Sequence, residues 1–151
     1  SLASLGGYMA SSEVVAEYVR HCSRPFIFSA SMTPANCACA LAALRVLEKE
    51  PQRVKRLHDI CMYTQAGLSE RQIPHKYTEV PIIPIYTYEA TRTLVIAKKL
   101  YEAGVYVNPV LPPATPATEC LLRTSYMATL TEPLLDEAMD IMAGVLGEES
   151  L

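Results

Sequence analysis

The sequence has 151 residues, 50% of them hydrophobic and 19% charged, which allows a buried core and excludes a disordered chain. The formal net charge is -3 and the lysines and arginines form no basic stripe of the kind that follows a phosphate backbone, so we expect no nucleic-acid partner. No apolar run approaches the roughly 20 residues that span a bilayer, and the first residues lack the charged start of a signal peptide. We therefore predict a cytoplasmic protein without a transmembrane segment.

The cysteines and histidines form no pattern that is typical of a metal or redox site. Cys37 and Cys39 are separated by a single residue, which is not the CxxC spacing of a redox pair or a zinc knuckle. The three histidines are not grouped with cysteines at metal-ligand spacings. We predict no metal site and expect most cysteines to be reduced packing residues. The five cysteines are Cys22, Cys37, Cys39, Cys61 and Cys120.

The first third of the chain is predicted to hold two helices and two short extended segments. It starts with neither an initiator Met nor a helix start, which is typical of the middle of a longer protein. Ser11 or Ser12 can cap a helix that ends at the Arg-Pro pair of residues 24–25. Thr33 or its neighbour opens an alanine-rich helix over residues 34–48. Residues 8–10 and 26–31 are predicted to be extended.

The rest of the chain begins with a long helix over residues 51–69 and then changes its pattern. Two prolines in the apolar run that starts at Val80 predict a buried strand that either lies at the edge of a sheet or pairs irregularly. Gly104 is predicted to end a helix in the left-handed conformation, and Thr131 to cap the last helix. The predicted order is a strand from 80, a helix over 91–103, strands at 105–107 and 119–126, and a helix over 132–145.

This order predicts an α+β layer with helices on one face of a small sheet. We interpret residues 1–50 as the remnant of a preceding, larger domain. Residues 51–75 would form a connecting helix, with the domain boundary inside it, and residues 76–151 a small C-terminal α+β domain. We see no internal repeat.

Arg123 is the first candidate for a functional residue, because it interrupts an apolar strand that follows a proline-rich loop at residues 108–116. If it is buried, the guanidinium needs an anionic or polar partner, which favours a clamp for a carboxylate. The alternative is an arginine on an edge strand with its head in water. The residues alone leave both open.

The other candidates lie in the first third of the chain. The hydroxyls of Ser29 and Ser31 precede the helix start at Thr33, where backbone N–H groups favour an anion such as a phosphate. Simple capping of the helix is the alternative. Gly6 and Gly7 either let the backbone approach a ligand closely or form a turn. From the residues alone, the chain is predicted to be an anion-binding fragment.

Several segments in a fixed order carry a resemblance to a known family. They are Ser-Leu-Ala-Ser-Leu-Gly-Gly-Tyr at 1–8, Ser-Arg-Pro-Phe-Ile-Phe-Ser-Ala-Ser at 23–31, Gly-Val-Tyr-Val-Asn-Pro-Val at 104–110, Pro-Pro-Ala-Thr-Pro at 112–116 and Leu-Leu-Arg-Thr-Ser at 121–125. In this order the chain resembles the α-oxoamine synthases, which are pyridoxal-phosphate (PLP)-dependent acyl-CoA:amino-acid C-acyltransferases of the aspartate-aminotransferase fold type. The serine palmitoyltransferase and 2-amino-3-ketobutyrate CoA ligase (glycine C-acetyltransferase) types are the most similar.

The resemblance implies an α/β parent enzyme of which this chain is the C-terminal portion. The parent would be a homodimer that condenses glycine or serine with an acyl-CoA, releases CoA and usually CO2, and uses PLP as an electron sink. Arg123 would bind the carboxylate of the amino acid. Phe28 and Ser29 would lie near the cofactor phosphate of the neighbouring subunit, Gly6 and Gly7 would belong to the cofactor loop, and the proline loop would shape the substrate entrance.

Two departures from the family pattern matter. Leu130 stands where the family often has His, which puts any role of that position in doubt. The resemblance also places the Schiff-base lysine upstream of residue 1, so this chain by itself is predicted to be inactive and not to bind PLP covalently. Two alternatives remain: the C-terminal domain of an ordinary class I/II aminotransferase, and a non-catalytic interaction domain. An exposed apolar face on residues 1–50 would count against the last of these.

Overall fold

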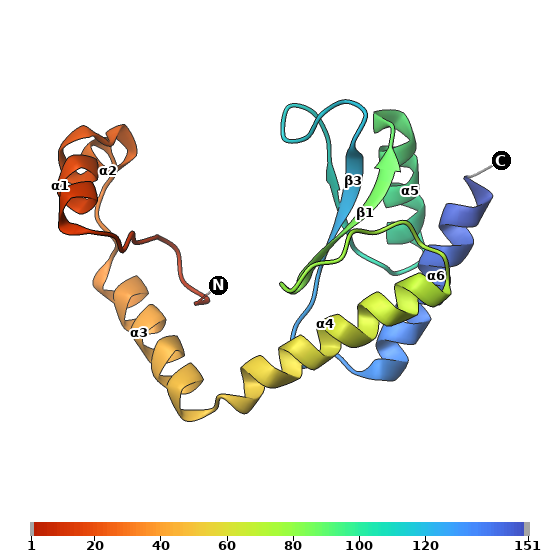
Figure 1. The fold of residues 1–151 in the computed structure, drawn as a ribbon, viewed down its shortest axis with the longest axis horizontal. Coiled ribbons are helices and arrows are strands. Elements are labelled where there is room, and N and C mark those ends of the chain that lie inside the picture. The colour runs from red at the N-terminus through yellow and green to blue at the C-terminus, as the bar shows by residue number, and fades with distance from the viewer. Residues whose placement is uncertain (1, 150–151) are drawn as a thin grey trace. The chain divides into compact units, whose positions relative to one another are not determined.

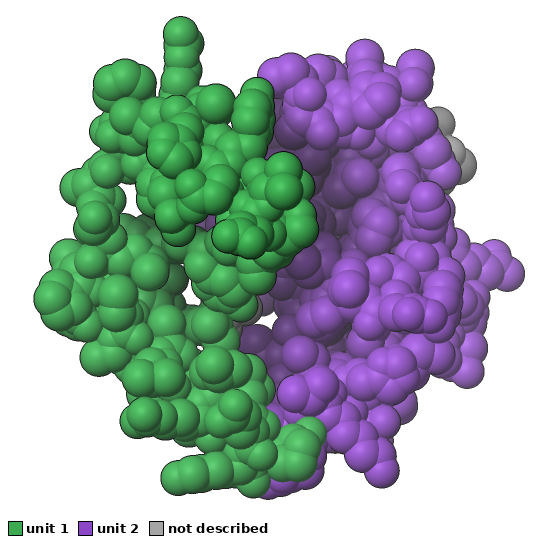
Figure 2. All heavy atoms as spheres, turned by 60° about the vertical axis from the view of Figure 1, so that its left-hand side comes forward, with its two compact units in different colours: residues 1–51 green, residues 52–151 purple. Residues whose placement is uncertain are grey.

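The structure is a computed structural model that describes residues 2–149, and it divides into two compact units between Pro51 and Gln52 (Figure 2). Unit 1 is residues 1–51 and unit 2 is residues 52–151. The elements, labelled in Figure 1, are α1 (Glu13–Cys22), α2 (Arg24–Phe28), α3 (Pro34–Lys49), α4 (Gln52–Glu70), β1 (Ile82–Tyr88), α5 (Ala90–Glu102), β2 (Asn108–Val110), β3 (Cys120–Ser125) and α6 (Glu132–Glu148).

Unit 1 consists of three helices without a core of their own. Helix α1 follows Ser12 as predicted, although the Ser12 side chain makes no capping hydrogen bond. Helix α3 follows Thr33, whose Oγ1 accepts a hydrogen bond from the Asn36 backbone N–H at 3.3 Å. None of the described residues of unit 1 is buried. Its apolar side chains therefore lie exposed, and the burial that stabilises most domains is missing here.

In unit 1 the strand predicted at residues 8–10 is wrong, and the extended segment predicted at 26–31 is wrong for residues 26–28, while Ser29 is extended. Residues 8–10 form no strand, because a strand needs a partner for its backbone groups and the described part of unit 1 contains none. Residues 24–28, which overlap the predicted extended segment at 26–31, form the short helix α2. Pro25 stands in its first turn, where proline favours a helix start. The β propensity of the Phe-Ile-Phe run is weak without a sheet to pack on.

The cysteines divide between the two units. Cys61 and Cys120 are buried in unit 2, as expected of packing residues. Cys22, Cys37 and Cys39 are exposed in unit 1, so the expectation that most cysteines are packing residues is wrong for these three. These three thiols are exposed because the described residues of unit 1 form no buried core against which a cysteine side chain could pack.

Unit 2 contains a three-stranded antiparallel sheet in the order β1-β3-β2. Strand β1 is at the edge, as its prolines predicted. Along β1 and β3 every second residue is buried, with Ile83, Ile85 and Leu122 fully covered. Since successive side chains of a strand point to opposite faces, one face of the sheet is buried and the other is open.

Three helices supply the other half of the core of unit 2. Helix α5 packs against all three strands, and α6 packs against both α4 and α5. The core joins Ile60 of α4, Ile96 of α5 and Met139 of α6 to the buried face of the sheet. This confirms the predicted α+β class. The last two helices also agree closely with prediction, because each has a start or stop signal in the sequence.

The strand predicted at residues 105–107 lies three residues further on, at Asn108–Val110. Gly104 ends α5 with a positive φ of 93°, as predicted. The N–H of Val105 then donates to Leu100 O of the helix at 2.8 Å, so it is not available for a sheet. The chain reaches the neighbouring strand only at Asn108, which is the partner of Arg123 in the register.

Helix α4, predicted as a connector, belongs to unit 2 by its contacts. One face of its second half is buried, and the Gln65 side chain makes two hydrogen bonds of 2.9 Å with the backbone N–H and carbonyl of Thr78. These bonds fix the segment that leads into β1. The division of the chain into two units therefore lies before α4, while the assignment of the two units to domains of a larger enzyme stays a prediction.

Within residues 2–149, no helix combines the length and apolar character that a membrane span requires.

Candidate functional site

The open face of the sheet in unit 2 carries the strongest candidate site. Arg123 stands in the central strand β3, between Pro84 of β1 and Asn108 of β2 in the register. Its neighbours Leu122 and Thr124 are buried on the opposite face. Arg123 is exposed because it points away from the helices. The side chains of this apolar run therefore alternate between the buried face of the sheet and the exposed face that carries Arg123.

The guanidinium of Arg123 is available for an external anion. Within residues 2–149, no side chain or backbone group makes a hydrogen bond or ion pair with it. Arg71 differs, since its Nε donates to Asp140 Oδ1 at 2.6 Å, and this carboxylate raises the pKa of the guanidinium. The alternative prediction placed Arg123 on an edge strand, which is wrong because β3 is the central strand. The same alternative expected an exposed guanidinium, which is correct.

Two further polar residues lie on the open face beside Arg123. Tyr106 and Asn108 are two residues apart, and the Tyr106 hydroxyl donates a hydrogen bond to Asn108 Oδ1 at 3.1 Å. Asn108 lies directly across from Arg123 in the β2–β3 register. Sequence reasoning did not single out Asn108 as a site residue. The register that makes it the neighbour of Arg123 depends on where β2 begins, which the sequence placed too early.

Aromatic residues border the same face along β1. Tyr86 and Tyr88 stack with ring centroids 5.7 Å apart. The register shifts between them, and Tyr88 has a positive φ of 69°. A bulge of this kind redirects a side chain at the end of a strand. The bulge thus keeps both rings on the rim of the face that carries Arg123.

The proline loop between β2 and β3 is held by local contacts. Its Pro112–Pro113 bond is cis. Thr115 Oγ1 donates to the carbonyl of Glu119 at 2.9 Å, which closes the loop just before β3. The stiff loop predicted from the prolines is therefore tied to the base of the strand that carries Arg123. Its predicted role at a substrate entrance stays a prediction.

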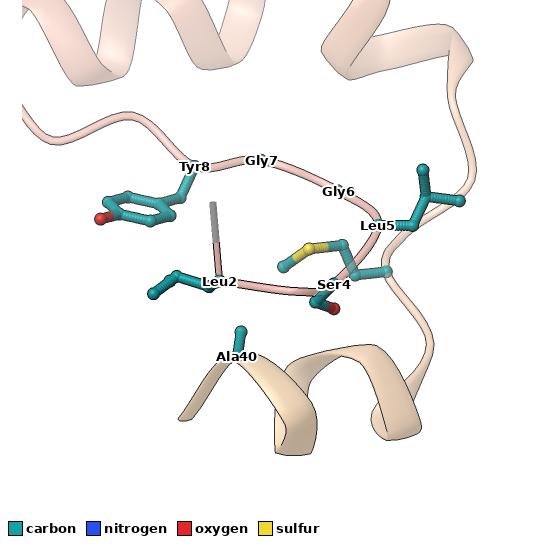
Figure 3. Close-up of a pocket in the computed structure, with 8 residues that line it drawn as sticks. Leu2, Ser4, Leu5, Gly6, Gly7, Tyr8 and Ala40 are labelled. Carbon is teal, nitrogen blue, oxygen red and sulfur yellow. The ribbon is translucent and has the colours of Figure 1, made fainter. Parts of the chain in front are cut away.

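Gly6 and Gly7 line a cavity of about 270 Å³ in unit 1 (Figure 3). The cavity lies between the loop that carries them and helix α3, which contributes Ala40. Ser4 Oγ ties this loop to α3 by donating to Asn36 O at 2.7 Å. Gly6 has a φ of 130°, and a Cβ on it would meet the Met32 sulfur at 2.1 Å. The Met32 side chain could move aside, so the positive φ, which residues with a side chain rarely adopt, is what favours glycine at this position.

Gly6→Ala is expected to destabilise a full-length protein that contains this segment by about 1–3 kcal/mol, because an alanine is strained at a φ of 130°. The matched control is Gly7→Ala, since a Cβ at Gly7 would meet nothing within 4 Å. Thermal unfolding of the three proteins measures the difference. Equal midpoints for the two variants would contradict the conformational role assigned to Gly6.

Phe28 and Ser29 lie at the C-terminal end of α2. Phe28 is 83% exposed, and Ser29 is an exposed residue in extended conformation. Thr33 caps α3, so the capping alternative holds for this hydroxyl. Within unit 1 the structure places Ser29 a few residues before that helix start. The phosphate role of Phe28 and Ser29 stays a prediction.

Comparisons with known proteins decide which family these features belong to. A family model described as aminotransferase class I and II matches residues 1–142. The chain belongs to the aminotransferase class I and II family. It is 40% identical over 151 residues to a serine palmitoyltransferase of Sphingobacterium spiritivorum, covering 100% of this chain and 38% of the relative. It is 38% identical over 145 residues to a putative 8-amino-7-oxononanoate synthase 2 of Mycobacterium tuberculosis, covering 96% of this chain and 19% of the relative.

Solved structures agree with this assignment. A serine palmitoyltransferase of Sphingomonas wittichii matches with a TM-score of 0.82 and 25% identity, covering 99% of this chain and 38% of that one. A high-resolution structure of SPT with PLP matches with a TM-score of 0.84 and 26% identity, over the same shares of the two chains. The predicted resemblance to α-oxoamine synthases within fold type I is confirmed. This aminotransferase-family chain spans less than two fifths of the length of these relatives.

Leu130, the departure from the α-oxoamine synthase pattern, lines an apolar cavity of about 230 Å³ in unit 2. Residues 105–107 and 124–126, which follow on from the β2–β3 pairs at the Asn108–Arg123 end, contribute to its lining. Tyr126 lies in its wall, with its hydroxyl 2.9 Å from Thr124 Oγ1. In this aminotransferase-family chain, Leu130 is therefore a partly buried packing residue.

Burial raises the pKa of Tyr126 to about 12, because the ionised phenol would lose its hydration. The folded-state pKa lies above the unfolded value of 10.0, so the stability contribution is present below pH 10 and is lost as the pH rises towards 12. We expect Tyr126→Phe to reduce the loss of stability over this range by about 2–3 kcal/mol. Urea unfolding of both proteins from pH 8 to pH 12 measures it. Parallel stability curves would contradict the raised pKa.

Proposed function

We propose that this chain is the C-terminal part of a PLP-dependent acyltransferase that condenses glycine or serine with an acyl-CoA. The observation that carries the proposal is Arg123, an exposed guanidinium without a described partner at the centre of the open face of the sheet. The similarity to serine palmitoyltransferases supports the reaction class. The chain spans only part of such enzymes, so the activity belongs to the complete protein.

Arg123 would bind the carboxylate of the amino acid. The five N–H donors of a guanidinium form a fork that fits two carboxylate oxygens at once. Its place in a central strand, paired on both sides, fixes the backbone from which the side chain projects over the open face. Tyr86 and Tyr88 would exclude water along one side of this site. The stiff proline loop would border the entrance for the acyl chain.

The residues present fit the rim of a PLP site. Ser29 offers an exposed hydroxyl that can donate to a phosphate, and Phe28 offers an exposed aromatic surface beside it. When bound, PLP supplies the electron sink for the amino acid's Cα. The first lysine of the chain is Lys49, in the last turn of α3. We propose that the lysine which binds PLP stands in the rest of the protein, and that this chain alone is inactive.

Unit 1 supports this proposal over a stand-alone interaction domain. It has no buried residue among those described, and it exposes large apolar side chains such as Val14, Tyr18, Phe26 and Ile27. An isolated domain would not leave such a surface uncovered. We propose that residues 1–50 belong to the large PLP-binding domain and residues 76–151 to the small domain, with residues 51–75 as the link. The large domain and the second subunit of a homodimer would cover the apolar side chains.

The test uses a full-length protein that contains this segment. It is loaded with PLP, supplied with glycine or L-serine and a series of acyl-CoA chain lengths, and CoA release is followed with a thiol reagent. We expect CoA release that depends on both substrates, and mass spectrometry of an amino ketone. Amino-group transfer to an oxo acid without CoA would support an ordinary aminotransferase. Absence of both reactions in the PLP-loaded protein would contradict the proposal.

A further inference from the structure

We propose that Asn108 is a second binding residue for the substrate carboxylate and that Tyr106 is the positioning residue that orients its amide. This inference rests on the proposed function, since it adds a donor to the carboxylate site at Arg123. It concerns which small molecules the site accepts. Asn108 and Tyr106 would select amines that carry a carboxylate over amines that do not.

The register of the sheet places Asn108 beside Arg123. The two residues are Cα partners across the antiparallel β2–β3 pair. Directly opposite side chains of such a pair lie on the same face, with Cβ atoms about 4.5–5.5 Å apart. Both residues are exposed on the face that the helices leave open. A carboxylate held by the guanidinium of Arg123 therefore lies within reach of the Asn108 side chain.

Tyr106 engages the carbonyl end of the Asn108 amide in the structure. Its hydroxyl donates to Asn108 Oδ1 at 3.1 Å, which engages the carbonyl end. Nδ2 then carries two N–H donors, and none of the residues in 2–149 accepts a hydrogen bond from it. Without the Tyr106 hydroxyl, the amide could turn and present its oxygen to the ligand. An oxygen there would repel a carboxylate.

The chemistry of a carboxylate calls for such a donor. An ionised carboxylate has about four lone-pair sites, and the fork of one guanidinium satisfies two of them. Asn108 can donate to a third without adding a charge that would compete with Arg123. Hydrogen bonds to a charged group are stronger than neutral ones. A neutral alcohol in place of the carboxylate would gain little from the same donor.

The experiment compares ligand pairs on the full-length, PLP-loaded protein by titration calorimetry. The ligands are glycine and L-serine, each with its carboxylate-free counterpart, methylamine or serinol. We expect Asn108→Ala to weaken binding of the amino acid that binds the wild type by about 10-fold, and Asn108→Asp to weaken it further by placing a negative charge at the carboxylate. Neither variant should weaken binding of the carboxylate-free amine.

Tyr106→Phe tests the orienting role, with an expected loss of about 2–5-fold for the amino acid alone, smaller than the loss of the donor itself. Its matched control is Tyr101→Phe, since Tyr101 is a 69% exposed tyrosine on α5, and binding should stay unchanged there. Equal weakening of both ligands of a pair, or no change in Asn108→Ala, would overturn the inference while the proposed function stands. A wild type that binds neither amino acid would overturn the proposed function, and this inference with it.

Discussion

Arg123→Ala in a full-length protein that contains this segment is expected to raise the KM for the amino acid about 100-fold, with the free energy of unfolding unchanged within about 0.5 kcal/mol. Truncating one partner of a hydrogen-bonded charge pair costs about 2–5 kcal/mol of binding, and each 1.4 kcal/mol is tenfold. Stability should not change because the side chain is exposed and has no described partner. Steady-state kinetics with varied amino acid and saturating acyl-CoA measure the change.

Two further variants test the geometry of the Arg123 interaction. Arg123→Lys keeps the charge and loses the two-pronged donor, so we expect a smaller rise of about 10-fold in the same KM. Lys98→Ala is the matched control for loss of a positive charge. Its side chain is 77% exposed, and it lies on helix α5, which packs against the opposite face of the sheet. A KM for the amino acid that is equal in the wild type and in Arg123→Ala would contradict a carboxylate site on the open face.

The elements that the sequence predicted well are those with local signals. Thr33 caps α3 through the Asn36 N–H, and Gly104 ends α5 at a positive φ. Such caps act within one turn of helix and need no information from distant residues. Glu89, which the sequence reading passed over, is also a local cap. It accepts from the N–H groups of Thr91 and Arg92, which lowers the pKa of its carboxyl.

The elements that were predicted wrongly depend on a partner far along the chain. Residues 8–10 and 26–31 have strand-like composition, yet a strand forms only where another strand can pair with it. Residues 105–107 look like a strand as well, but the helix end takes up the N–H of Val105. Each miss follows from hydrogen bonds whose partners the local sequence does not determine.

The candidate site was predicted in part. The resemblance identified Arg123, and the structure adds that it is exposed, central and without a described partner. Asn108 was quoted only as part of a motif, because its role follows from the register with Arg123. A register is a property of two strands together, and a shift of one residue would send Asn108 to the other face. The structure was needed to show that these two residues are neighbours in the sheet.

Leu122→Ala in the 151-residue chain is expected to lower the free energy of unfolding of unit 2 by about 2–5 kcal/mol. Leu122 is fully buried, with 0% of its surface exposed, and belongs to the core that joins the sheet to α4, α5 and α6. Its removal leaves a cavity between layers that cannot close without moving a helix. Urea unfolding followed by circular dichroism measures the change.

Arg123→Ala in the same 151-residue chain is the matched control for Leu122→Ala, because the two residues are adjacent in β3 and point to opposite faces. We expect a change within about 0.5 kcal/mol for this variant, since surface substitutions away from special contacts have small effects. The two variants together compare how much each face of one strand contributes to the stability of unit 2. If both variants lost the same stability, Arg123 would be part of the packing of unit 2, and the open face would no longer be available as a binding surface.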